Sequence, residues 1–133
     1  MRWNFRLDFR FLMVVDIDEA EFLATVRDCV FERIGDFGII VNSKLEVRLL
    51  FNTLREIANN GIRIQRPRPE DTRTLVIGNS IDRVTAASGG DGPHGNGINI
   101  FRAHNVLVEG NHITNCTFSA IRANLGDGCR YIG

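Results

Sequence analysis

A short apolar pair recurs along this chain at a fixed spacing, and this repeat restricts the possible folds more than any other feature. A glycine or alanine precedes an isoleucine with intervals of 23, 36 and 23 residues, at Gly38-Ile39, Gly61-Ile62, Gly97-Ile98 and Ala120-Ile121. The middle interval equals the period of 23 plus 13 inserted residues. A fixed period of this length predicts a solenoid, in which each repeat packs against its neighbours.

The inserted residues fall in two stretches that have the composition of surface loops. Nine of them lie within AASGGDGPHGN, residues 86–96, and four lie within RPRPEDT, residues 66–72. Glycine, proline and charged residues dominate both stretches, as is typical of loops. All three prolines, Pro67, Pro69 and Pro93, occur there. We therefore expect two loops on the surface and no proline inside a strand.

A repeat of 23 residues with three short apolar alternations has the size of one coil of a parallel β-helix. The expected inward side chains of one coil are Val106, Val108, Ile113, Cys116, Ile121 and Ala123. Those of the preceding coil are Thr74, Val76, Ile81, Val84, Ile98 and Ile100. Stacked coils about 4.8 Å apart would share one continuous core and pair their backbones along the stack.

The period divides the chain into rungs of a single domain covering residues 1–133. We place complete rungs at residues 21–43, 44–66, 75–102 and 104–125, and the start of another at residues 126–133. Residues 1–20 form either an earlier rung or a cap. The final residues align with Val106–Gly110, and the sequence ends where the next rung would bring an asparagine. We therefore expect this chain to be part of a longer protein, whose remaining rungs pack against it.

Residues 18–60 also permit a helical interpretation. Leu50, Leu54 and Ile57 would lie on one helical face, and Gly61 is a plausible helix stop. Strands are favoured because this segment keeps the register of the two later repeats, in which Gly-Asn at a turn separates apolar runs.

Asn52, Asn79 and Asn111 each stand two residues before the next apolar position of their repeat. At one corner of successive coils their side chains can stack and hydrogen-bond to one another, forming a ladder. Cys29 occupies the equivalent place in an earlier repeat and interrupts the ladder. The cysteines have no metal-binding spacing, so we expect isolated thiols that pack as small hydrophobic groups, with Cys116 buried and unpaired.

Composition excludes two classes of function. The chain has 133 residues with 16 basic and 16 acidic side chains, which is not the basic excess of a nucleic-acid binder. Its longest uncharged apolar run, residues 11–15, is too short to span a membrane.

The stretch over residues 59–124 resembles the right-handed parallel β-helix proteins of the pectin-lyase-like superfamily. It is most similar to the twin-arginine-secreted β-helix repeat proteins, in the loop His94-Gly95-Asn96-Gly97-Ile98-Asn99 and in NVLVEGNHITNCTFSAIRAN that follows. The resemblance implies a truncated right-handed β-helix of four to five rungs. It also implies a bacterial protein of the periplasm or the extracellular space.

Enzymes of that superfamily bind their substrate along one outer sheet, which the resemblance places here on the Gly-Ile strands. Side chains alternate along a strand, so the outward positions form two files. One file contains Ile40, Arg63, Asn99 and Arg122, and the next contains Asn42, Gln65, Phe101 and Asn124. Arginines, amides and an aromatic ring suit a polysaccharide, particularly an anionic one. A solvated outer sheet without a ligand would also be polar.

The longer insertion precedes one of these strands and carries Asp91 and His94, the candidate catalytic residues. A lyase needs a base and a cation that stabilises the resulting anion. His94 or an arginine could take part, and Asp91 could bind calcium, although we expect no metal or other cofactor.

The interpretation is a β-helix repeat protein that binds or processes a polysaccharide, as a lyase or glycoside hydrolase if it is catalytic. The alternative is a structural or adhesive solenoid with a protein partner.

Overall fold

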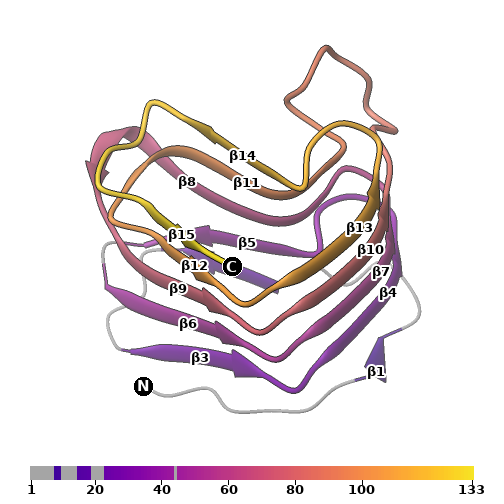
Figure 1. The fold of residues 1–133 in the computed structure, drawn as a ribbon, viewed down its shortest axis with the longest axis horizontal. Helices are drawn as coiled ribbons and strands as arrows, with labels where there is room; N and C mark the ends of the chain where they lie inside the picture. The colour runs from indigo at the N-terminus through magenta and orange to yellow at the C-terminus, as the bar shows by residue number, and fades with distance from the viewer. Residues whose placement is uncertain (1–7, 10–14, 19–22, 44) are drawn as a thin grey trace.

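The computed structural model describes residues 8–9, 15–18, 23–43 and 45–133, which form three parallel sheets. Sheet A has the order β1 (Asp8–Phe9), β4 (Val30–Ile34), β7 (Thr53–Ile57), β10 (Ser80–Val84) and β13 (His112–Cys116). Sheet B has the order β2 (Val15–Asp18), β5 (Ile39–Asn42), β8 (Asn60–Asp71), β11 (Asn96–His104) and β14 (Ile121–Asn124). Sheet C contains β3 (Ala24–Arg27), β6 (Glu46–Leu50), β9 (Arg73–Ile77), β12 (Leu107–Glu109) and β15 (Arg130–Ile132). Figure 1 shows these strands stacked as successive coils around a common interior.

The register of the coils follows the Gly-Ile repeat. Ile62 of β8 pairs in parallel with Ile39 of β5 and with Ile98 of β11, and Ile98 pairs with Ile121 of β14. The isoleucines of the repeat therefore stay in register despite the insertions, and the predicted parallel β-helix is confirmed.

Alternation along each strand builds the core. In sheet B, Ile39, Val41, Ile62, Ile64, Ile98 and Ile100 are all completely buried. Sheets A and C contribute Phe31, Leu54, Ile81, Val47, Leu49 and Val76, which are likewise inaccessible to solvent. Because each interior coil is covered by the coils on either side, the apolar side chains form one continuous column. This column fixes which side chains of each strand must face outward.

The helical alternative for residues 18–60 is wrong where the structure describes that segment. Strands β3 to β7 occupy it, and Leu54 and Ile57 point into the core while Leu50 is partly exposed. The helical pattern arises because coil corners shift the alternation between strands. Pairing with neighbouring coils satisfies the backbone and outweighs local helix propensity.

The corner between sheets C and A carries the asparagine ladder. The Asn52 N–H donates to Asn79 Oδ1 at 2.9 Å, and the Asn79 N–H donates to Asn111 Oδ1 at 2.8 Å. The Cys29 N–H donates to Asn52 Oδ1 at 3.1 Å. The Cys29 side chain therefore ends the ladder, but its backbone N–H still bonds to the first asparagine of the ladder. Phe51, Gly78 and Gly110 precede these asparagines with φ between 54° and 67°, the left-handed conformation that makes each corner sharp.

One of the two expected loops is a strand instead. Strand β8 continues through Pro67 and Pro69 to Asp71, and its pairing with β11 shifts from Gln65↔Phe101 to Glu70↔Ala103. The extra residues form a bulge in which both prolines are exposed, so the expectation that no proline lies within a strand is wrong. Proline is tolerated there because bulged residues have no ladder partner.

A buried arginine holds this bulge together. Arg66 is 3% exposed; its Nε donates to Glu70 Oε1 at 2.6 Å and its Nη1 donates to Asn42 Oδ1 at 2.8 Å. The second insertion, residues 85–95, is an irregular loop, as expected.

The last described coil is covered on one side only. Ile113, Cys116 and Ile121 pack against the core but are partly exposed, and Ala123 is exposed. Cys116 is free and pairs in register with Val84, as expected, but it is half-buried rather than buried. The expected rung or cap over residues 1–20 falls mostly outside the described residues.

Candidate binding groove on sheet B

The predicted binding residues come together on the outer face of sheet B. Arg63, Asn99 and Arg122 are register partners in three successive coils, as are Gln65, Phe101 and Asn124. A pocket of about 130 Å³ is lined by Arg63, Pro93, Asn99, Phe101, Arg122 and Asn124. Five of the six expected residues therefore line one pocket, joined by a proline of the loop.

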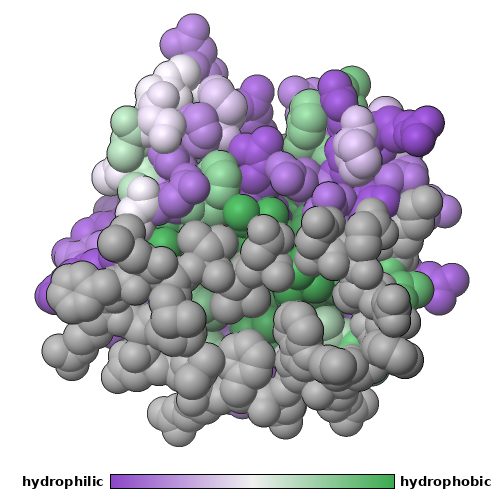
Figure 2. Space-filling model, turned by 180° about the vertical axis from the view of Figure 1, so that it is seen from behind, coloured by the Kyte–Doolittle hydropathy of each residue, from purple (hydrophilic) through white to green (hydrophobic). Residues whose placement is uncertain are grey.

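The two insertions flank this face. Figure 2, seen from behind Figure 1, shows a hollow between two projecting walls. The left wall in that view corresponds to the loop of residues 85–95, which rises at the upper right of Figure 1, and the other wall lies where the strands of sheet B end. Hydrophilic side chains line much of the hollow. Sheet B is therefore the floor of this hollow, where β8, β11 and β14 carry the pocket. We call it the sheet B groove.

Four asparagines attach the loop to the coils. Asn59 Oδ1 accepts from the Ser88 N–H at 2.9 Å, and Asn60 Nδ2 donates to the Pro93 carbonyl at 3.0 Å. Asn96 Nδ2 donates to the Gly92 carbonyl at 2.8 Å, and Asn99 Nδ2 donates to the Pro93 carbonyl at 2.9 Å. These bonds satisfy the Ser88 N–H and the Gly92 and Pro93 carbonyls, which an irregular loop would otherwise leave without partners.

Asn99 differs from the expectation of an open outer position. It is only 5% exposed, and its Nδ2 is already engaged by the loop. Its amide therefore holds the wall of the groove as well as lining the pocket. The sequence places Asn99 in the right file, but the path of the loop over it is a tertiary feature.

Arg63 is held by several groups at once. Its Nε donates to Gln65 Oε1 at 2.6 Å, and its guanidinium carbon lies 5.2 Å from the centroid of the Phe37 ring. Burial lowers the pKa of Arg63, and the negative charge of Asp36 opposes this shift. Arginine nevertheless stays charged at physiological pH. Gln65 thus supports Arg63 rather than lining the pocket.

Arg122 has a different environment. Its guanidinium lies beside Gly92, where an added Cβ would be 2.6 Å from Nη1. Within the part of the chain that the structure describes, it makes no hydrogen bond or ion pair. Beside it in the pocket, Phe101 has the Arg102 guanidinium 4.6 Å from its ring centroid.

The candidate catalytic residues do not form an acid–base pair. His94 Nδ1 lies 2.9 Å from the Gly89 carbonyl, and the His94 ring stacks on Phe37 with centroids 5.9 Å apart. Because a carbonyl only accepts, Nδ1 carries the proton. Asp91 is exposed, and the structure shows no hydrogen bond between it and His94. Among the described residues no three His, Cys, Asp or Glu side chains gather as a metal site.

Sequence reasoning missed Phe37, Pro93 and three of the loop-anchoring asparagines, Asn59, Asn60 and Asn96. A usable signal existed for two of them, because Asn60 and Asn96 both immediately precede the repeated glycine. They form a second, shorter ladder in which Asn60 Oδ1 accepts from the Asn96 N–H at 3.1 Å. The sequence carries no comparable signal for Phe37, because its role depends on where the loop places His94.

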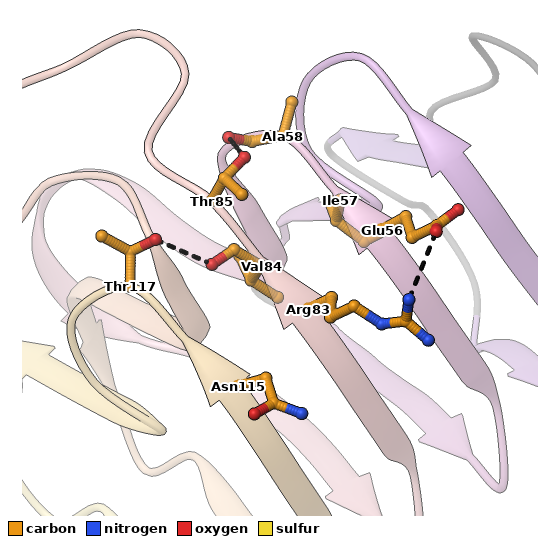
Figure 3. A pocket seen from close by; sticks show the side chains of 8 residues that line it. All are labelled: Glu56, Ile57, Ala58, Arg83, Val84, Thr85, Asn115 and Thr117. Atoms are coloured by element: carbon orange, nitrogen blue, oxygen red, sulfur yellow. Dashed lines mark hydrogen bonds and ion pairs between the residues drawn. The ribbon is translucent and has the colours of Figure 1, made fainter.

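A second pocket, of about 360 Å³, opens on sheet A (Figure 3). Its lining consists of Glu56, Ile57, Ala58, Arg83, Val84, Thr85, Asn115 and Thr117. Figure 3 shows Glu56 reaching toward Arg83, and their closest atoms are 3.5 Å apart. The other oxygen of Glu56 accepts from Arg33 Nε at 3.2 Å. The charged groups at this pocket therefore already have partners from neighbouring coils.

The next file of sheet A compensates its charges in the same way. Arg55 lies 3.8 Å from Glu32, and Asp82 lies 3.0 Å from Arg83. Asn115 and Thr114 donate to Asp82 Oδ1, and these two bonds and the one from Arg83 lower the pKa of Asp82 to about 2. Opposite charges alternate along and across this face, so we interpret the sheet A pocket as structural.

Comparison with known proteins gives the family of this chain. The model of the right-handed β-helix region matches residues 15–130, and the chain belongs to this family. No curated protein and no solved structure matches the chain significantly. The described residues contain no helix long and apolar enough to cross a membrane.

Proposed function

We propose that this chain binds a polysaccharide along the sheet B groove, as a pectin-lyase-like β-helix protein of the bacterial periplasm or extracellular space. One observation carries the proposal. Register pairing brings two arginines, two amides and an aromatic ring from three successive coils into one pocket beside an anchored loop. Sugar recognition uses this combination of charge, hydrogen bonding and ring stacking.

The spacing along the stack suits a linear ligand. Coils are about 4.8 Å apart, so the Cα atoms of Arg63 and Arg122 are separated by roughly 10 Å. Two neighbouring sugars can bridge that distance. Because guanidinium groups bind carboxylates through paired hydrogen bonds, an anionic polysaccharide is the preferred ligand.

We propose binding rather than turnover. His94 has its Nδ1 engaged by a loop carbonyl and its ring packed on Phe37, while Asp91 is exposed. Neither residue is arranged as a general base aimed into the pocket. If the chain is catalytic, its chemistry is that of a polysaccharide lyase or glycoside hydrolase. We propose no metal, cofactor or nucleic-acid partner; calcium near Asp91 is the alternative.

The experiment measures binding to acidic and neutral oligosaccharides by titration calorimetry. Changing Arg63 and Arg122 together to alanine should weaken binding of the acidic ligands at least tenfold and reduce its salt sensitivity. The matched control changes Arg73 and Arg130, two exposed arginines of sheet C, to alanine. This control removes the same charge from another face and should bind like the parent. Equal effects of both double variants, or no binding by the parent, contradict the proposal.

One observation favours the alternative of an adhesive solenoid with a protein partner. The outer face of sheet C carries partly exposed apolar side chains in three adjacent strands, at Leu50, Leu75, Ile77 and Leu107. Contiguous apolar surface of this kind marks interaction sites. If this role holds, changing Leu75 and Leu107 to aspartate removes retention of a protein partner, and the parent binds no oligosaccharide.

A further inference from the structure

The two arginines of the sheet B groove are not equivalent, although the sequence repeat makes them so. We propose that Arg122 is the residue that grips the anionic group of the ligand, while Arg63 is a positioning residue that supports the groove wall. This inference rests on the proposed function and assigns the specificity within that site.

Arg63 already has partners for its Nε donor and for one face of its guanidinium. Gln65 accepts from its Nε at 2.6 Å, and the Phe37 ring lies under its guanidinium at 5.2 Å. Phe37 in turn stacks on His94 of the loop. Arg63 therefore connects the groove floor to the loop through an aromatic side chain. An anion that binds Arg63 side-on through Nε would displace Gln65 and disturb the contacts that hold the wall.

Arg122 keeps its donors available. No described residue accepts a hydrogen bond from its guanidinium, which carries five N–H donors in a fixed plane. It lines the pocket in the coil next to Asn99 and is partly buried. Partial burial strengthens an incoming charge-assisted bond because water competes less for the guanidinium.

Gly92 provides the space that Arg122 occupies. This glycine has a φ of +135°, and a Cβ there would lie 2.6 Å from Nη1 and 3.2 Å from Cζ of Arg122. Any other residue at this position would strain the backbone and displace the guanidinium. The glycine-rich composition of the loop thus has a local role at the binding residue.

Asn99 adds an acceptor beside this donor. Its Nδ2 is fixed by the Pro93 carbonyl, which leaves Oδ1 as the group available to a ligand. Arg122 and Asn99 are register partners about 4.8 Å apart. A sugar that carries an anionic group next to a hydroxyl matches this donor and acceptor, whereas the same sugar without the charge loses the paired, charge-assisted bonds to Arg122.

The test compares oligogalacturonate with its methyl ester, which retains the sugar backbone and loses the charge. The parent should bind the acid at least tenfold more tightly than the ester. Arg122→Ala should abolish this preference by weakening only the acid, and Gly92→Ala should reduce it although Arg122 is present. Arg63→Ala should retain the ratio of the two affinities, even where both are weaker.

Urea unfolding of each variant separates lost folding from lost binding, and Arg122→Lys supplies a folded control. Lysine keeps the charge without the paired donors, so it should give an intermediate preference. If Arg63→Ala abolishes the preference and Arg122→Ala retains it, the assignment is wrong and the proposed function stands. If the parent binds neither probe, the proposed function itself fails.

Discussion

Replacing Asn79 by alanine tests the asparagine ladder at its middle rung. Asn79 is 1% exposed and its side chain serves both neighbouring coils. Oδ1 accepts from the Asn52 N–H at 2.9 Å and from Asn52 Nδ2 at 3.0 Å. Nδ2 donates to the Leu49 carbonyl at 3.0 Å and to Asn111 Oδ1 at 2.9 Å. Alanine removes all of these bonds.

The expected loss of stability follows from what remains buried. The Asn52 N–H would lose its acceptor in a place that water does not reach, and an unsatisfied buried donor costs about 1–3 kcal/mol. Asn52 Nδ2 loses less, because it also donates to the Val26 carbonyl at 3.0 Å. With the lost bonds to Leu49 and Asn111 included, Asn79→Ala should lower the free energy of unfolding by about 3 kcal/mol.

Urea unfolding followed by circular dichroism measures this loss. With an m-value of about 2 kcal/mol per M, the midpoint should fall by about 1.5 M. Asn111→Ala is the matched control, because Asn111 is only half-buried and water can replace part of its bonding. That variant should lose about 1 kcal/mol. A loss below 0.5 kcal/mol for Asn79→Ala, or a larger loss for Asn111→Ala, would refute the reasoning.

Three further predictions concern single positions. Gly61→Ala should lower the free energy of unfolding by about 2 kcal/mol or more, because its Cβ would lie 2.6 Å from a carbonyl oxygen of the next coil. Gly110→Ala lies in open space at φ +62° and should lower it by about 1 kcal/mol in the same urea assay. Hydrogen bonds to the Asp82 carboxylate lower its pKa to about 2. These bonds stabilise the fold at pH values above the ordinary carboxyl pKa, and their contribution disappears as pH falls through about 2. The stability difference between the parent and Asp82→Asn should therefore shrink from pH 4 to pH 2, and an unchanged difference contradicts the prediction. Burial raises the pKa of Cys116, so a thiol reagent should label the native protein slowly at Cys116 and not at buried Cys29. Both cysteines should be labelled after unfolding, and rapid labelling of Cys29 in the native protein contradicts the prediction.

The fold could be predicted because the repeat fixes register and direction together. The Gly-Ile pairs mark one strand of each coil, and the asparagines mark one corner, so two independent signals agree on the same period. Local helix propensity over residues 18–60 conflicted with them. The period prevailed because burial of every coil depends on its neighbours rather than on local preference.

The candidate site could be predicted as a file of side chains but not as a set of contacts. Register alone placed Arg63, Asn99 and Arg122 on one face. It could not show that Asn99 is held by the loop, that Arg63 packs on Phe37, or that Arg122 remains available. Those differences depend on the path of residues 85–95, and a glycine-rich loop leaves few periodic signals in its sequence.

The bulge in β8 was missed for a different reason. Proline usually excludes a central strand position, so RPRPEDT predicted a loop. The structure satisfies that rule locally, because the extra residues between Gln65 and Glu70 have no pairing partners in β11. Burial of Arg66 against Glu70 then keeps the strand continuous on both sides.

The most direct test of binding in the sheet B groove is an NMR titration of the labelled protein with oligogalacturonate. Chemical-shift changes should concentrate on the outward residues of β8, β11 and β14 and on residues 85–95. They should saturate together and disappear at high salt if the ligand binds through its charge. Changes confined to the outer face of sheet C, or none at millimolar ligand, would contradict the account.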